Sequence, residues 1–89
     1  MIQRELTIIN KLGLHARAAS RLVNLCSQFA SEVFLERNGN RVNAKSIMGV
    51  MMLAASQGSR LTLEVDGDDE QTCADAIAEL VANRFDEAE

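Results

Sequence analysis

Residues 31–44, SEVFLERNGNRVNA, carry the clearest local structural signal in the chain. Val33 and Leu35 alternate with the residues at even positions, and this period of two is typical of a strand with one buried face. The pair Asn38 and Gly39 follows, and both residue types readily adopt the positive φ angles that a tight hairpin turn requires. The stretch therefore predicts two strands joined by a short turn.

Segments on either side of this hairpin complete a small sheet. ELTIIN, residues 5–10, is rich in β-forming residues and predicts a first strand. RLTLEV, residues 60–65, places Leu61, Leu63 and Val65 on one face and predicts a last strand. We therefore expect four strands that share one apolar face.

Three helices are predicted from apolar residues that recur at helical spacing. The first covers residues 16–29. The second is short and covers residues 47–55, with Ser46 as its N-cap and Gly49 weakening its middle. The third follows the turn DGDDEQ, whose carboxylates favour a helix N-terminus. The inward-facing residues of this third helix are Ala74, Ile77, Ala78, Val81 and Phe85.

The resulting order of elements is βαββαβα. Helices that follow strands in this way usually pack on one face of an antiparallel or mixed sheet, which is the α+β arrangement. The chain has 89 residues and is 47% hydrophobic, so it can bury one small core. We therefore expect a single domain over residues 1–89.

Composition and charge exclude several function classes. The net charge is −4 at pH 7, whereas nucleic-acid binding needs a concentrated basic face. No apolar segment is long enough to cross a bilayer, and the N-terminus carries no targeting pattern. We expect a cytoplasmic protein that binds neither nucleic acid nor membrane.

Cofactor and metal chemistry find no support in the residue types. There is no phosphate-binding glycine loop and no dinucleotide fingerprint, so we expect no cofactor. Cys26 and Cys73 fall on the apolar sides of predicted helices and are expected to be buried free thiols. One histidine and two distant cysteines cannot form a usual zinc site, so no metal is expected. The carboxylates cluster near turns and the C-terminus, where we expect them to be solvated.

The stretch GLHARAAS contains the only histidine, His15, at the expected start of the first helix. Free N–H groups and the positive dipole end make such a helix start an anion site. Arg17 adds donors suited to phosphate oxygens, and Arg21 lies four residues on along the same face. A neutral imidazole is also a good nucleophile toward phosphorus. A lone histidine beside a helix start is more often a surface or capping residue, so residue types alone leave both interpretations open.

The motif GLHARAAS and the long stretch NGNRVNAKSIMGVMMLAASQGSRLTLEVDGDDE resemble the HPr family. This family comprises the histidine-containing phosphocarriers of the bacterial phosphoenolpyruvate-dependent sugar phosphotransferase system. The resemblance covers essentially the whole chain. It implies a four-stranded antiparallel sheet of order 1-4-2-3 with three helices on one face, which agrees with the element order above.

The resemblance also implies roles for individual residues. His15 would accept a phosphoryl group on Nδ1, and Arg17 would steady that group. Ser46 would match the serine that a dedicated kinase, HPr kinase/phosphorylase, modifies in many members. Enzyme I would be the donor and EIIA domains the acceptors, with the protein acting as a monomeric carrier rather than an enzyme. The partner surface would comprise Ala16, Ser20, Arg21, Ile47, Met48 and Met51.

The family usually has proline where Ala18 stands, and proline presets φ near a helix start, so we expect altered rigidity without loss of the acceptor chemistry. Ile47, Met48, Met51 and Met52 cannot all face one core from so short a helix. Some of these four residues are expected to fill core gaps, while an apolar patch formed by others suits a surface that accepts several partners.

Two alternative functions are also consistent with the sequence. The chain could belong to a regulatory, nitrogen-type branch of the phosphotransferase system that transports no sugar. It could also be a docking module that is never phosphorylated, although such a module has no need for an imidazole at a helix start.

Overall fold

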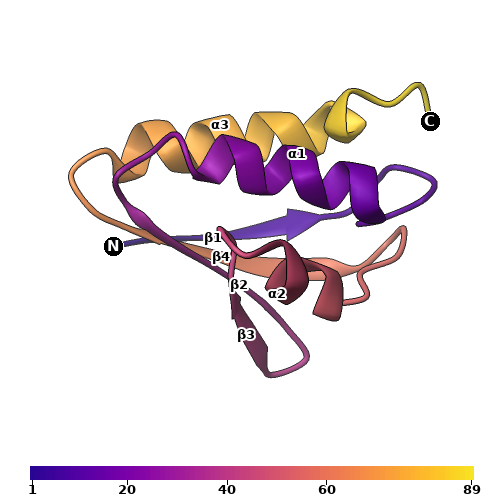
Figure 1. Cartoon of the computed structure of the whole chain (residues 1–89), viewed down its shortest axis with the longest axis horizontal. Coiled ribbons are helices and arrows are strands. Elements are labelled where there is room, and N and C mark those ends of the chain that lie inside the picture. Colours follow the sequence, from indigo (N-terminus) through magenta and orange to yellow (C-terminus); the bar gives the residue numbers. More distant parts are fainter.

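The computed structural model describes all 89 residues and places three helices over a four-stranded sheet (Figure 1). The strands are β1 (Ile2–Thr7), β2 (Glu32–Arg37), β3 (Asn40–Asn43) and β4 (Arg60–Asp66). The helices are α1 (Ala16–Cys26), α2 (Ile47–Met52) and α3 (Glu70–Ala82), followed by the short 3-10 turn η1 (Arg84–Asp86). The predicted order βαββαβα is confirmed.

The β2–β3 hairpin forms where the sequence predicts it. Asn38 and Gly39 both adopt positive φ, at 52° and 86°, and join the two antiparallel strands. Val33 and Leu35 are each only 1% exposed, as their alternation predicts. The local signal alone was sufficient here because the turn and the strand pattern agree on one register.

The sheet order is β1-β4-β2-β3, so the last strand in the sequence lies between the first and the second. All three strand pairs are antiparallel. Leu63 of β4 pairs with Arg4 on one side and Leu35 on the other. The order 1-4-2-3 and the α+β class are therefore confirmed.

One hydrophobic cluster forms the core between sheet and helices. It takes Leu61, Leu63 and Val65 from the central strand β4, together with residues from all three helices. Figure 1 shows α1 and α3 lying side by side over the sheet, with the shorter α2 near β3. This packing places the start of α1 and the end of α3 at the same end of the molecule.

Several predicted boundaries are wrong at the ends of elements. The first strand covers Ile2–Thr7 rather than residues 5–10, because Thr7 pairs with Arg60, the first residue of β4. Helix α1 ends at Cys26 and α2 ends at Met52, each about three residues earlier than expected. In both helices the chain continues with hydrogen bonds between residues three apart, which close the last turn and end the α-helix.

Phe85 is fully buried, as expected, but it does not belong to the third helix. That helix ends at Ala82, and the chain then turns through three consecutive residues with positive φ, Arg84, Phe85 and Asp86, at 57°, 53° and 62°. Residues in the left-handed region turn the chain away from the axis along which α3 would otherwise continue. The phenyl ring stays in the core while the C-terminal tail reverses toward α1.

Both cysteines are buried and unpaired, as predicted. Burial raises the pKa of the Cys26 thiol to about 12. Burial also raises the pKa of Cys73. Neither thiol is activated for nucleophilic chemistry, because the thiolate is the reactive form.

None of the helices combines the length and the hydrophobicity that a span across a bilayer requires.

Candidate functional site

The loop before His15 is held by two contacts from elsewhere in the chain. The Leu14 N–H donates to the Ala55 carbonyl at 2.8 Å, and Asn10 Nδ2 donates to the Gly13 carbonyl at 2.8 Å. Gly13 adopts φ +66°, and a Cβ there would lie 2.8 Å from the Ser56 Cα. Only glycine fits this position, because the backbone after α2 approaches too closely for any side chain.

His15 is the N-cap residue of α1, and its side chain makes no capping hydrogen bond. The first helical bond runs from the Ala19 N–H to the His15 carbonyl at 2.8 Å. The N–H groups of residues 16–18 therefore have no acceptor within the helix, as expected for its first turn. The imidazole is 29% exposed, so it is neither a core residue nor fully solvated.

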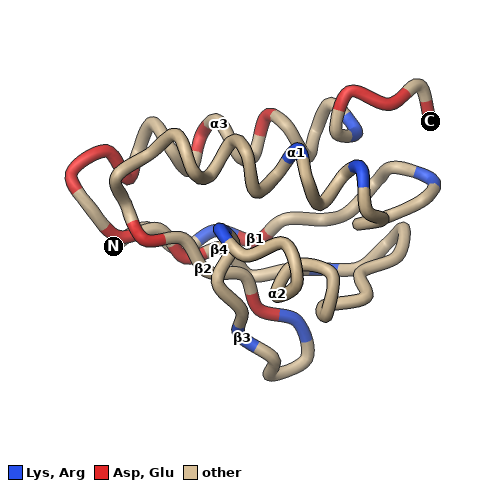
Figure 2. Tube along the Cα trace, viewed as in Figure 1, with Lys and Arg blue, Asp and Glu red and all other residues tan.

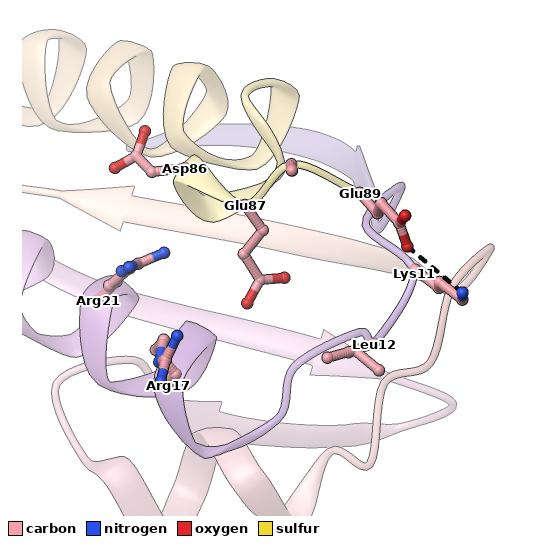
Figure 3. Close-up of a pocket in the computed structure, with 8 residues that line it drawn as sticks. Lys11, Leu12, Arg17, Arg21, Asp86, Glu87 and Glu89 are labelled. Carbon is pink, nitrogen blue, oxygen red and sulfur yellow. Dashed lines mark ion pairs between the residues drawn. The ribbon is translucent and has the colours of Figure 1, made fainter.

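Arg17 and Arg21 lie on one face of α1 and line a cleft of about 450 Å³ between the helix and the C-terminal tail. The other residues of this cleft are Lys11, Leu12, Asp86, Glu87, Ala88 and Glu89. Figure 3 shows both arginines projecting from α1 toward the tail. Arg17 is exposed and takes part in no ion pair, whereas Arg21 donates to the Phe85 carbonyl. The predicted common face of the two arginines is confirmed.

The expectation that C-terminal carboxylates are solvated is wrong for Glu87. Its side chain is only 16% exposed and lies against the imidazole, where Oε2 meets His15 Nε2. Its other oxygen, Oε1, accepts a hydrogen bond from Asn10 Nδ2 at 2.9 Å. Sequence reasoning missed this residue because 72 positions separate it from His15 and no local pattern links them.

Desolvation by itself would raise the pKa of Glu87. The hydrogen bonds from Asn10 and His15 and the neighbouring charges of His15 and Arg21 outweigh this effect, so the pKa is lowered. Glu87 is therefore ionised at neutral pH and can only accept hydrogen bonds.

Acidic residues of the C-terminal tail therefore lie beside the basic patch that was expected around His15. Figure 2 shows the acidic C-terminal tail, in red, at the same end of the molecule as the start of α1. The tail is fixed beyond Glu87 by an ion pair between Lys11 Nζ and Glu89 Oε2 at 3.3 Å, drawn as a dashed line in Figure 3. The Lys11 N–H also donates to the Glu89 carbonyl.

Helix α2 presents an apolar surface. Ile47, Met48, Met51 and Met52 are 40%, 73%, 44% and 75% exposed. The expectation that some of them fill core gaps is wrong: Val50, on the opposite side of this six-residue helix, is the residue that enters the core. We call these four exposed residues the α2 patch.

The helix that carries the α2 patch packs against α1, the helix that His15 caps. Helices α1 and α2 contact each other, and the Ala55 carbonyl just beyond α2 accepts the hydrogen bond from Leu14. On α1, Ala16 and Ser20 are exposed. Ala18, which stands at the family's usual proline position, is fully buried.

Ser46 is exposed and caps α2, as predicted. Its Oγ accepts a hydrogen bond from the Gly49 N–H at 3.2 Å. The hydroxyl therefore lies at the edge of the α2 patch, directly before Ile47.

Comparison with known proteins identifies the family to which this chain belongs. The family model described as "PTS HPr component phosphorylation site" matches residues 2–83. The phosphocarrier protein HPr of Cupriavidus necator is 62% identical over 89 residues, which is the full length of both chains. HPr-C-His from Thermoanaerobacter tengcongensis superposes with a TM-score of 0.96 at 42% identity and covers all of both chains. An HPr dimer from the same organism has a TM-score of 0.79 at 42% identity, covering 98% of this chain and all of its own. The chain belongs to the HPr family, the phosphocarrier proteins of the phosphotransferase system.

Proposed function

We propose that this protein accepts a phosphoryl group on Nδ1 of His15 from phosphorylated enzyme I and passes it to EIIA domains, which supports sugar uptake and its regulation. The observation that carries this proposal is the placement of the only imidazole at the open N-terminus of α1, beside an arginine-lined cleft. The protein would be a carrier and a substrate, with no turnover of its own, and would need neither cofactor nor metal.

Three features of the site favour a phosphorylated state. The N–H groups of residues 16–18 have no acceptor within the helix, and together with the positive end of the helix dipole they favour a bound anion. The guanidinium of Arg17 is exposed and free of ion pairs, so it is available for phosphate oxygens. The Nδ1 lone pair would form the new bond to phosphorus as the bond from phosphorus to the donor breaks, its electron pair leaving with the donor.

Ile47, Met48 and Met51 of the α2 patch form the proposed docking surface, together with Ala16, Ser20 and Arg21 on α1. These three apolar side chains are 40% to 73% exposed on one short helix and gain from burial against a partner. Flexible thioethers adapt to more than one partner surface, and a carrier must meet both a donor and an acceptor. Each partner could then reach His15 from the α2 side.

Ser46 is the proposed regulatory site, modified by HPr kinase/phosphorylase where the host has that enzyme. Its exposed hydroxyl borders the α2 patch, so a phosphate there would bring a dianion into an apolar docking surface. Burying that charge without a partner is costly, which would weaken docking while leaving the fold intact.

The output of the carrier is the main alternative. In a regulatory branch of the phosphotransferase system the chemistry at His15 would be the same, but no sugar would be transported. We further propose that the chain acts as a cytoplasmic, single-domain monomer, and size-exclusion chromatography with light scattering tests the last point, since a related HPr forms a dimer.

The decisive experiment incubates the protein with enzyme I and phosphoenolpyruvate and locates any phosphate by mass spectrometry. We expect one acid-labile, base-stable phosphate on His15. His15→Ala should fold normally, because the side chain is outside the core, and should carry no phosphate. Phosphate that persists in this variant would contradict the proposal, and so would an unmodified wild-type protein, which would favour a docking module.

A further inference from the structure

We infer that Glu87 is a positioning residue for phosphoryl transfer: its carboxylate accepts the Nε2–H of His15 and thereby leaves the Nδ1 lone pair free to attack phosphorus. This inference rests on the proposed function, because it concerns the same imidazole. It assigns a role to the acidic C-terminal tail, which neither composition nor local pattern suggested.

The tautomer follows from the contact between the two side chains. In a neutral imidazole one nitrogen carries the proton and the other accepts, and the partner of one nitrogen decides which is which. Nε2 of His15 faces Oε2 of Glu87, and an ionised carboxylate has no proton to donate. Nε2 must therefore carry the hydrogen, and Nδ1 keeps its lone pair.

The carboxylate is itself held in place by a buried amide. Asn10 is fully buried, and its Nδ2 donates both to Glu87 Oε1 at 2.9 Å and to the Gly13 carbonyl at 2.8 Å. Asn10 Oδ1 is buried without a hydrogen-bond partner. The Asn10 amide therefore holds Glu87 through its nitrogen while its own oxygen stays unpaired. The result is a chain of contacts from the loop backbone through Asn10 and Glu87 to His15.

The tail is anchored on both sides of Glu87. On one side, Arg21 donates to the Phe85 carbonyl, and Phe85 is fixed in the core. On the other side, Lys11 pairs with Glu89 through both its side chain and its backbone. Figure 3 shows Glu87 reaching from the tail into the space that Arg17 and Arg21 face. The position of Glu87 is therefore set by the fold and does not depend on the His15 contact alone.

This geometry supports two stages of the transfer. Before the reaction, Glu87 keeps the ring oriented and Nδ1 unprotonated, as a carboxylate does for a histidine nucleophile or base. When Nδ1 bonds to phosphorus and the donor departs with the electron pair of its broken bond, positive charge develops on the ring. Nε2 keeps its proton, and the Glu87 carboxylate that accepts from it stabilises the positive charge on the ring.

The test combines a tautomer measurement with a rate. Nitrogen-15 NMR of the free protein at alkaline pH should show His15 protonated at Nε2 and unprotonated at Nδ1. In Glu87→Ala the two tautomers should mix, and the rate of phosphorylation by enzyme I should fall on the order of tenfold, the effect of losing one hydrogen bond to a charged group. Glu87→Gln keeps an acceptor without the charge and should give an intermediate rate with the tautomer largely preserved.

Glu79→Ala is the matched control, because it removes an exposed carboxylate of α3 that takes part in no ion pair and lies outside the cleft lined by Arg17 and Arg21. We expect this variant to keep the wild-type tautomer and rate. A wild-type imidazole protonated at Nδ1, or an unchanged rate in Glu87→Ala, would overturn the inference while the proposed function stands. A faster rate in Glu87→Ala would also overturn it and would make the tail an inhibitory cover. A wild-type protein that takes up no phosphate would overturn both.

Discussion

Replacing Gly13 by alanine tests whether the backbone after α2 sets the position of the loop before His15. The new Cβ would meet the Ala55 carbonyl oxygen and lie 2.8 Å from the Ser56 Cα. Both are backbone atoms of a segment that also accepts the hydrogen bond from Leu14 at 2.8 Å. The loop and this segment must therefore move apart to admit the methyl group.

The expected loss has two sources. Holding alanine at φ +66° costs about 1–2 kcal/mol, because a Cβ in the left-handed region crowds the carbonyl oxygen. Moving the loop weakens the bond between the Leu14 N–H and the Ala55 carbonyl, worth about 0.5–1.5 kcal/mol. We therefore expect the free energy of unfolding to fall by about 1.5–3.5 kcal/mol in Gly13→Ala.

Gly39→Ala is the matched control for this prediction. Gly39 also has a positive φ, at 86°, but a Cβ there would have no atom within 4 Å. Its replacement should cost only the backbone term, about 1–2 kcal/mol. Urea unfolding of the two variants and the wild type, read by circular dichroism, gives the comparison. Equal losses in the two variants would show that the close approach of the Ala55–Ser56 backbone does not contribute to the cost of Gly13→Ala.

Four further predictions follow from the site and its surroundings. Arg17→Ala should slow transfer by roughly ten- to a hundredfold while His15 still becomes phosphorylated, because one charge-assisted contact is worth about 1.5–3 kcal/mol; an unchanged rate in stopped-flow transfer assays would make Arg17 ordinary surface charge. Ser46→Asp should slow phosphorylation by enzyme I with almost no change in melting temperature, since aspartate is also a good N-cap; an unfolded variant would make Ser46 structural, and a normal rate would remove the regulatory role. Met48→Ala should raise the KM for enzyme I but change the free energy of unfolding by less than about 0.5 kcal/mol, because the side chain is 73% exposed; an unchanged KM would exclude Met48 from the docking surface. Asp69→Asn should lower the melting temperature at neutral pH and flatten the decline of the melting temperature in acid. Hydrogen bonds, first from the Ser31 hydroxyl and then from the Ala30 N–H, lower the pKa of Asp69 below its ordinary value of 3.8, so the stability that the carboxylate contributes is lost only as pH falls through that lowered pKa. Parallel plots of melting temperature against pH for the variant and the wild type would contradict this prediction.

The Asp69 prediction concerns stability alone. Its carboxylate accepts from the Ala30 and Ser31 N–H groups at 2.9 and 3.0 Å and ties the start of α3 to the chain before β2. The group lies away from the cleft, so the variant should be phosphorylated at the wild-type rate when it is measured well below its melting temperature.

Elements whose signals are local could be predicted from the amino-acid sequence. The β2–β3 hairpin depends on the alternation of Val33 and Leu35 and on Asn38 and Gly39, all within seven residues. Ser46 was predicted as a cap because the cap and the N–H it accepts are three residues apart. His15 stood out because it is the only histidine and starts a helix, and the HPr resemblance rests on that same motif.

The ends of those elements and the partner of the imidazole depend on long-range packing. Strand β1 ends at Thr7 because its partner begins at Arg60, and no residue near Thr7 records that pairing. The methionines of α2 are exposed because Val50 already occupies the core position of so short a helix. Glu87 reaches His15 only because the chain reverses after α3 and closes 72 residues of separation. Contacts of that range depend on the packing of the whole core, so a pattern read over a few residues does not contain them.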